Sequence, residues 1–97
     1  MAQLFQEMKK DLYITKVWVD DNYVYAETRD GLQAKYAFSD WNRLSKATPE
    51  QRRDFKLSYF GIHWPQIDED LSFEGMFSDN HPEMMLREND ITVCYNE

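Results

Sequence analysis

The sequence predicts an α+β fold: a three-stranded antiparallel β-meander with one or two short helices on one face, a further short extended segment and a brief helix. Three successive segments alternate apolar and polar residues with a period of two, as half-buried strands do. After Phe38 the period changes, and two helix-start signals follow in succession. Strands followed by helices in this order are typical of the α+β class.

Two short turns join the three strand segments. Segment 12–19 is β-branched and aromatic, and segments 23–28 and 33–38 alternate in the same way. Residues 20–22, Asp-Asp-Asn, have the composition of a turn whose side chains bond their own backbone. Residues 29–32 contain Asp-Gly, the pair typical of a type I′ hairpin turn, which has positive φ at both central residues. This order predicts an antiparallel meander.

Two short helices are predicted after the meander, where we expect them to cover one of its faces. Segment 39–47 begins at Ser39, a good N-cap, and places its apolar residues on one helical face. Segment 48–55 begins at Thr48, a second N-cap, and Gln51 stands where a capping box has Glu or Gln.

A further extended segment and a brief helix come next. Segment 56–64 is rich in β-forming residues, and Gly61 within it indicates a bulge or the close approach of another backbone. Pro65 ends the segment. Segment 70–77 is predicted to form a helix capped by Ser72, with the acidic residues before it favouring its N-terminus.

We expect one domain, because 97 residues support a single small core. Its parts are predicted to be a flexible N-terminal lead at 1–11, a single α+β domain at 12–77, and an acidic C-terminal tail at 78–97 that allows one extra strand at 91–95. No apolar run is long enough to cross a membrane, and the single cysteine, Cys94, cannot form an internal disulfide. We therefore expect a cytoplasmic protein without membrane contact.

The net charge of −7 is unevenly distributed along the chain. Residues 66–97 contain nine acidic residues and one basic residue, Arg87, whereas the charges of residues 1–65 nearly cancel. An acidic end of this size repels phosphate backbones, so we expect no direct nucleic-acid binding. A basic protein partner is the more natural complement.

The stretch YFGIHWPQIDEDLS (59–72) concentrates the residues that can carry chemistry. His63, Asp68 and Asp70 are metal-ligand types, but they lie at no established ligand spacing. The simpler interpretation is that these acids serve the N-terminus of the following helix. We therefore expect no metal and no cofactor.

Signals of catalysis are equally weak. A nucleophile needs an activating base within reach, and the sequence offers only two histidines, His63 and His81. Cys94 has no basic neighbours that would lower its pKa. We expect no enzyme. The alternative that stays open is a small metal-dependent or hydrolytic enzyme that uses His63 with Asp68 or Asp70.

An acidic surface with an apolar anchor predicts a protein–protein contact instead. The candidate partner-binding residues are Trp64, Asp68, Glu69, Asp70 and Glu74. The open edges of a meander also allow a homodimer. Tyr23 and Tyr25 share one face of the meander, and two interpretations of that face stay open: an exposed recognition surface, or packing at the rim of the core.

Several motifs, taken together, resemble one bacterial family. FSDWNRL, ATPEQR and GIHWPQIDEDLSFEGM follow one another in the order and spacing of the family called Domain of Unknown Function 2442, over roughly residues 12–77. The resemblance implies a small α+β domain and no established activity or catalytic residue. It differs at Asn42, where relatives usually have proline.

The resemblance also implies a biological setting. Genes of this family often lie beside genes of another family of small proteins, in an arrangement similar to toxin–antitoxin pairs. We therefore expect a protein–protein interaction or regulatory module, the antitoxin-like member of a two-gene pair. Its protein partner would be basic and encoded nearby.

Overall fold

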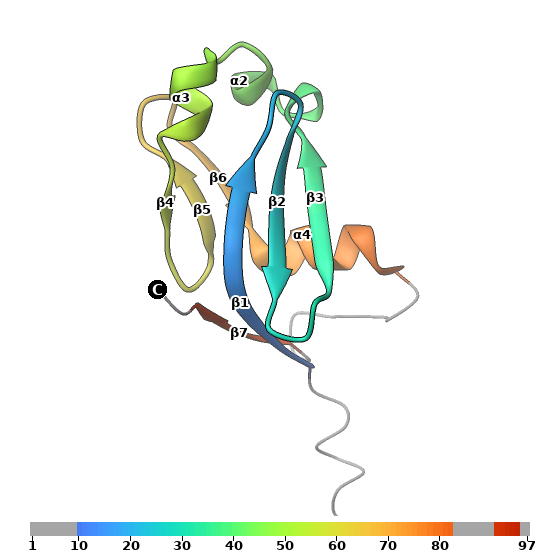
Figure 1. The fold of residues 1–97 in the computed structure, drawn as a ribbon. Helices are drawn as coiled ribbons and strands as arrows, with labels where there is room; N and C mark the ends of the chain where they lie inside the picture. Colours follow the sequence, from blue (N-terminus) through green and yellow to red (C-terminus); the bar gives the residue numbers. More distant parts are fainter. Residues whose placement is uncertain (1–9, 83–90, 96–97) are drawn as a thin grey trace, which may run out of the picture.

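The computed structural model of the chain describes residues 10–82 and 91–95. This part contains two β-sheets and four short helical segments (Figure 1). The four-stranded sheet, in the order β3-β2-β1-β7, consists of β1 Lys10–Val19, β2 Tyr23–Thr28, β3 Gln33–Ala37 and β7 Ile91–Tyr95. The three-stranded sheet, in the order β4-β5-β6, consists of β4 Lys56–Leu57, β5 Gly61–Trp64 and β6 Glu69–Ser72. The helical segments are the 3₁₀ turn η1 Phe38–Asp40, α2 Asn42–Ser45, α3 Pro49–Arg53 and α4 Phe73–Asn80.

The predicted meander and the α+β class are confirmed. Strands β1, β2 and β3 pair antiparallel in sequence order. Asp20 closes the first turn, because its Oδ1 accepts hydrogen bonds from the backbone N–H groups of Asn22 and Tyr23, each at 2.8 Å. Strand β1 begins at Lys10, so the paired structure reaches two residues into the segment predicted as a lead.

The second turn differs from the predicted type. The loop 29–32 has four residues, and Gly31 alone in it has a positive φ, of 89°. A type I′ turn requires positive φ at both central residues, so that prediction is wrong. The N–H groups of Thr28 and Gly31 close the loop on the carbonyls of Leu32 and Thr28, each at 2.9 Å, and this larger loop needs only one left-handed residue.

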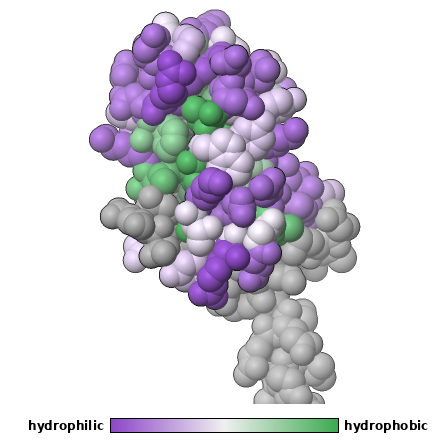
Figure 2. All heavy atoms as spheres, viewed as in Figure 1, coloured by the Kyte–Doolittle hydropathy of each residue, from purple (hydrophilic) through white to green (hydrophobic). Residues whose placement is uncertain are grey.

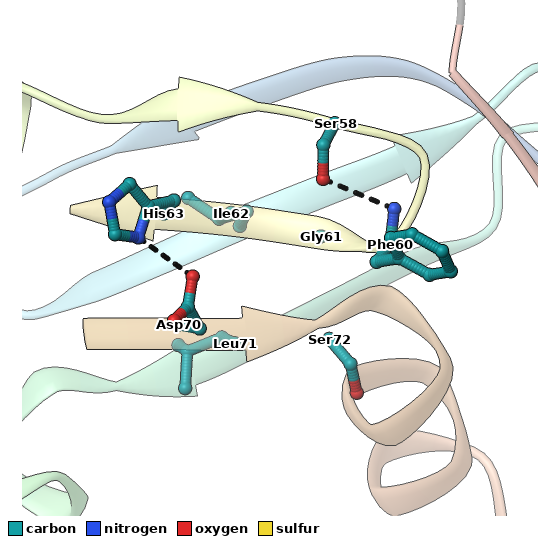
Figure 3. Close-up of a pocket in the computed structure, with 8 residues that line it drawn as sticks. All are labelled: Ser58, Phe60, Gly61, Ile62, His63, Asp70, Leu71 and Ser72. Atoms are coloured by element: carbon teal, nitrogen blue, oxygen red, sulfur yellow. Dashed lines mark hydrogen bonds and ion pairs between the residues drawn. The ribbon is translucent and has the colours of Figure 1, made fainter. Parts of the chain in front are cut away.

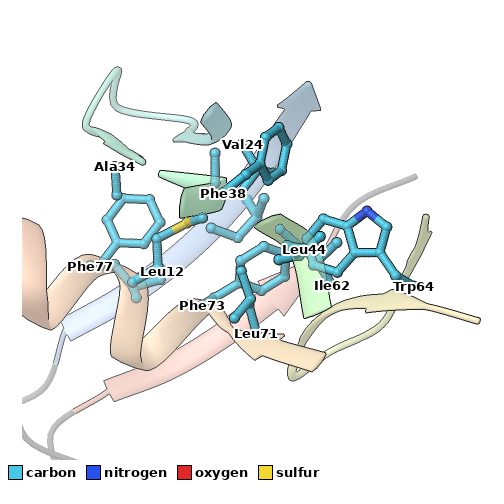
Figure 4. Close-up of a cluster of buried hydrophobic side chains, with 13 residues drawn as sticks. Leu12, Val24, Ala34, Phe38, Leu44, Ile62, Trp64, Leu71, Phe73 and Phe77 are labelled. Atoms are coloured by element: carbon cyan, nitrogen blue, oxygen red, sulfur yellow. The ribbon is translucent and has the colours of Figure 1, made fainter. Parts of the chain in front are cut away.

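The core lies between two layers (Figures 1 and 4). One layer is the four-stranded sheet. The other is the three-stranded sheet together with α4; in Figure 1 α4 passes behind β2 and β3, and the β4–β5 hairpin stands to the left of β1. The fully buried core residues are Leu12, Ile14, Val24, Ala26, Ala34, Phe38, Leu44, Ile62, Trp64, Leu71, Phe73, Met76 and Phe77. Four of these thirteen residues, Phe38, Trp64, Phe73 and Phe77, are large aromatics, which bury more area per residue than the aliphatic members.

The two predicted helix starts have opposite outcomes. At α3 the capping box is present: Thr48 Oγ1 accepts from Gln51 N at 3.1 Å, and Gln51 Oε1 accepts from Thr48 N at 2.9 Å. Ser39 does not cap a helix, because it lies inside η1, and α2 begins only after Trp41, which adopts extended angles. The burial of Phe38 and the extended Trp41 divide the predicted segment 39–47 into two short turns.

The predicted extended segment 56–64 is a hairpin. Strands β4 and β5 are connected by a turn in which Ser58 N donates to Gly61 O at 3.0 Å. The chain then reverses through Asp68, whose φ of 54° is left-handed, and returns as β6 beside β5. The acids at 68–70 therefore lie in a turn and a strand, so their predicted place at a helix start is wrong.

Helix α4 begins as predicted and extends beyond the predicted end at residue 77. Ser72 Oγ accepts from Gly75 N at 2.9 Å, and the helix continues to Asn80. The Asn80 side chain pairs with the backbone of β3: its Oδ1 accepts from Lys35 N at 3.1 Å, and its Nδ2 donates to Lys35 O at 2.9 Å. No described helix is long and apolar enough to span a membrane.

Both edges of the meander are partly covered by other segments of the chain. Asn80 occupies the edge of β3 in the way that a neighbouring strand would, and His81 Nε2 lies 2.6 Å from Gln33 O on the same edge. Strand β7, at the 91–95 segment for which the sequence allows a strand, pairs in parallel with the first half of β1. The edge argument for a homodimer is therefore restricted to what remains of β1.

Candidate functional site

The outer face of the three-stranded sheet carries the candidate site. Lys56, His63 and Asp70 lie opposite one another on β4, β5 and β6 and form one row of side chains. Gly61 and Ser72 form the next row. Figure 3 shows this face, where His63 and Asp70 point toward each other across β5 and β6. We call it the contact face.

Gly61 forms the floor of a shallow hollow in the contact face. A Cβ at this position would lie 1.9 Å from the backbone oxygen of Leu71, so only glycine allows the two strands to approach this closely. The predicted close backbone approach is confirmed. The hollow has a volume of about 220 Å³ and is lined by Ser58, Phe60, Gly61, Ile62, His63, Asp70, Leu71 and Ser72.

In the described part of the chain, His63 and Asp70 form the one hydrogen bond between two side chains on this face. The Nδ1 of His63 lies 2.7 Å from Asp70 Oδ1. The side chains of His63 and Asp70 are 41% and 74% exposed, respectively. Exposed pairs of this kind contribute little to stability, so this pair costs the protein little to rearrange against a partner.

The two serine hydroxyl groups near the His63–Asp70 pair accept hydrogen bonds from backbone N–H groups. Ser58 Oγ accepts from Phe60 N at 3.2 Å, and Ser72 Oγ accepts from Gly75 N at 2.9 Å. Both serines therefore stabilise a turn and a helix start. The face presents a histidine oriented by a carboxylate, with no hydroxyl positioned on that histidine in the described residues.

Two exposed aromatic residues lie at the tip of the hairpin beside the hollow. Tyr59 is 69% exposed and Phe60 is 82% exposed, and they are the large hydrophobic residues that the described surface exposes most. Phe60 lines the hollow itself. Neither residue was among the predicted site residues, because segment 56–64 was predicted to be extended throughout. The Ser-Tyr-Phe-Gly sequence is a turn composition that could have located them.

Trp64 does not belong to this exposed surface. Its side chain is fully buried, its ring packs edge-on against Phe55 at 6.2 Å, and its Nε1 donates to Arg52 O at 2.9 Å. The inward direction of Trp64 follows from the strand period, since the neighbouring His63 points outward. Trp64 is therefore a core residue, and the predicted apolar anchor must be replaced by Phe60.

The four acidic residues predicted to bind a partner do not share one surface. Asp70 lies on the contact face, but Glu69 lies opposite Trp64 on the other face, and its Oε2 accepts from Asp70 N at 3.1 Å. Asp68 is exposed in the turn, where its backbone oxygen accepts from Arg43 Nη1 at 2.5 Å. Glu74 is half-buried in the first turn of α4.

The alternative metal site is not assembled. Of its three candidate ligands, only His63 and Asp70 contact each other. Within residues 10–82, where all three lie, no group of three or more His, Cys, Asp and Glu side chains could hold a metal ion. Asp68 lies in the turn between β5 and β6, where its φ is 54°, and not in the strand row of the pair.

The opposite face of the molecule carries Tyr23 and Tyr25. Trp18 stacks on Tyr25 with ring centroids 5.0 Å apart, and Tyr23 lies 6.0 Å from Tyr25. Tyr25 OH donates to Asp20 Oδ2 at 2.6 Å, and this bond, with two backbone N–H groups, lowers the pKa of Asp20. These half-buried rings contact one another rather than presenting free faces, which favours the rim-packing interpretation.

Comparison with known proteins gives one result. Residues 14–82 match the model of a family described as "Protein of unknown function (DUF2442)". No curated protein and no solved structure matches the chain. The matched region extends from β1 past the end of α4 and includes every residue of the contact face.

Proposed function

The chain belongs to the DUF2442 family, as its motifs suggested, and we propose that it is a protein–protein interaction module whose contact face binds a basic protein partner. The observation that carries this proposal is the exposure of Phe60, at 82%, beside the hollow of the contact face. An aromatic side chain held in water beside a concave surface is typical of an interface anchor.

The charge of the surroundings favours a basic partner. Residues 66–82 contain five acidic residues, Asp68, Glu69, Asp70, Glu74 and Asp79, and no lysine or arginine. Of these acids Asp70 is the one that lies in the row of the contact face, together with Lys56 and His63. Asp70, at 74% exposure, lies directly on the contact face. A partner arginine could take the place of His63 on Asp70 without leaving a buried charge unpaired.

The biological role that fits this surface is the regulatory, antitoxin-like member of a two-gene pair. A module of this kind acts by covering a partner's surface, so it needs exposed anchors and no catalytic group of its own. We therefore propose no enzymatic activity and no cofactor, and a partner encoded beside the gene of this protein.

Affinity capture of the full chain from a lysate of its source organism at low salt, followed by quantification of the captured neighbouring gene product, tests the proposal. We expect this product in a stoichiometric amount. Phe60→Ser should reduce its affinity at least about tenfold, the effect of losing one anchor residue. Asp70→Asn should reduce it less and make it less dependent on salt.

Asp40→Asn is the matched control, because Asp40 is also exposed but lies in η1, away from the contact face. It makes the same change of charge and should leave the affinity unchanged. Equal affinity of the wild type and Phe60→Ser, or an equal loss with Asp40→Asn, would count against the contact face.

The His63–Asp70 contact is the one observation that favours the enzymatic alternative, since a carboxylate that orients a histidine is part of many acid–base sites. His63→Ala separates the two functions. The interaction proposal expects this variant to retain partner binding. It expects neither the variant nor the wild type to hydrolyse generic ester and phosphate substrates or to contain metal in elemental analysis of the purified protein.

A further inference from the structure

Strand β1 is paired along only part of its outer edge. Strand β7 pairs with its first half, and the register ends where Tyr95 lies opposite Ile14. On the other side, β2 pairs with β1 as far as Val19. Within the part of the chain that the structure describes, no strand therefore pairs with the outer edge of β1 beyond Ile14.

The backbone groups of Val17 and Val19 point toward this open edge. Asp20 N donates to Tyr23 O at 3.0 Å, so these two residues form a hydrogen-bonded pair between β1 and β2. Hydrogen-bonded and non-hydrogen-bonded pairs alternate along antiparallel strands. Val17 and Val19 lie three residues and one residue before Asp20 in the same register, so both direct their N–H and C=O groups away from β2. In the described chain none of these four groups has a hydrogen-bond partner.

A hydrophobic strip lies beside this edge. Val17, Val19, Phe55 and Leu57 are half-buried and pack against the margin of the core. We call these four residues the β1 strip. Figure 2, seen from the same side as Figure 1, shows a hydrophobic area to the left of β1, between this strand and the β4–β5 hairpin. Polar residues lie above it in this view.

We propose that the open edge of β1 at Val17 and Val19 binds an extended segment of another protein, which adds to the sheet as a strand. The four unpaired backbone groups favour a strand as the ligand, because an extended main chain presents its own N–H and C=O groups in the matching spacing. The β1 strip requires an apolar side chain at every second position of that segment. Strand β7 already occupies the first half of the same edge, so β1 accepts a strand there.

A hollow at the Val19 end of the edge extends this surface. It has a volume of about 150 Å³ and is lined by Val19, Asp20, Asp21, Pro49, Arg52 and Arg53. The side chain that follows the paired stretch would enter this hollow. This surface does not include the contact face, and the inference does not depend on the proposed function.

Amide hydrogen exchange of the free full chain, read residue by residue by NMR, is the first test. We expect the amides of Val17 and Val19 to exchange quickly and the amide of Trp18, in a hydrogen-bonded pair, to exchange slowly. Slow exchange of Val17 and Val19 at every protein concentration would overturn the proposal, because the chain itself would then cover the edge. Protection that increases with protein concentration would overturn it as well, in favour of a second copy.

A panel of synthetic peptides of about eight residues, with Val, Ile, Leu, Tyr or Phe at alternate positions, is the second test. At least one member should bind and slow the exchange of the Val17 and Val19 amides. Methylation of its alternate backbone nitrogens should weaken binding at least about tenfold, because main-chain hydrogen bonds are lost. Failure of the whole panel, or unchanged binding after methylation, would overturn the proposal.

Two variants of one residue complete the test. Val17→Pro removes the N–H that points to the open edge and should therefore abolish peptide binding. The variant should still fold, because proline is tolerated at edge positions whose N–H faces solvent. Val17→Thr keeps this N–H and the branched shape, and it should retain binding. If Val17→Pro is poorly folded, the methylated peptide on the wild type gives the same answer.

Discussion

Two of the glycines have different structural roles. Gly61 has no space for a Cβ, since the backbone oxygen of Leu71 would lie 1.9 Å away. Gly31 has nothing within 4 Å of a Cβ, but its φ of 89° is unfavourable for other residues. The first glycine is required by packing and the second by backbone conformation.

We therefore expect Gly61→Ala to lower the free energy of unfolding by about 3 kcal/mol, because β5 and β6 must separate. Gly31→Ala should cost only about 1 kcal/mol, the cost of a left-handed conformation. Urea denaturation of both variants measures these differences. Equal losses at the two positions would contradict the close approach of β5 and β6.

The Tyr36 hydroxyl contributes to stability in a pH-dependent way. It donates to Asp79 Oδ2 at 2.5 Å, and burial together with this carboxylate raises the pKa of Tyr36 well above its ordinary value. A raised pKa in the folded state means that the stabilisation is complete below the ordinary pKa of about 10 and is lost as the pH rises above it.

The free energy of unfolding of the wild type should therefore fall as the pH increases from about 9 to about 11. In Tyr36→Phe this fall should be smaller, because the group that resists ionisation is absent. Denaturation curves across this range, with the two proteins measured side by side, decide the point. Parallel pH dependences would contradict a stabilising role of the Tyr36–Asp79 bond.

At the scale of elements, the end of α4 protects the edge of β3. Asn80 pairs with both backbone groups of Lys35, and its Nδ2 also donates to Met76 O at 2.7 Å. An edge strand with free backbone groups is prone to association, so this side chain prevents pairing with another chain.

Asn80→Asp keeps an acceptor for Lys35 N but loses both donor contacts. We expect a loss of about 1–3 kcal/mol of stability and an increase in concentration-dependent association, measured by denaturation and by sedimentation. Asn42→Asp makes the same chemical change at an exposed position of α2 and should have little effect. If the two variants behaved alike, the side chain of Asn80 would not protect the edge of β3.

Local chemistry determined which elements the sequence could predict. Alternating strands and the capping box at Thr48 depend on neighbours in the sequence, and the structure contains them. Segment 39–47 was predicted as one helix, but Trp41, which adopts extended angles and packs against the core, interrupts it. Segment 56–64 was predicted as one strand, although pairing of Leu57 with Ile62 makes it a hairpin. Both errors arise from tertiary contacts that no local pattern reports.

The candidate site was predictable only in part, for the same reason. The sequence located the stretch 59–72 but not the direction of its side chains. The pairing of β5 with β6 brings His63 to Asp70 and turns Trp64 into the core. A strand period over Gly61–Trp64 would have given Trp64 and His63 opposite directions, but not which of them faces the core.

At the scale of the whole molecule, two layers leave three different surfaces. The outer face of the four-stranded sheet carries aromatic rings that stack on one another. The open edge of β1 carries unpaired backbone groups. The contact face carries Phe60 and Asp70 and has the exposed anchor that a protein interface needs.

The central claim is that the contact face binds a protein partner. The most direct measurement is an NMR map of backbone chemical shifts of the full chain, recorded without and with the captured neighbouring gene product. We expect the largest changes at Phe60, His63 and Asp70, with small changes at Trp18 and Tyr25. Changes concentrated at Trp18 and Tyr25, or no changes at a saturating amount of this product, would contradict the central claim.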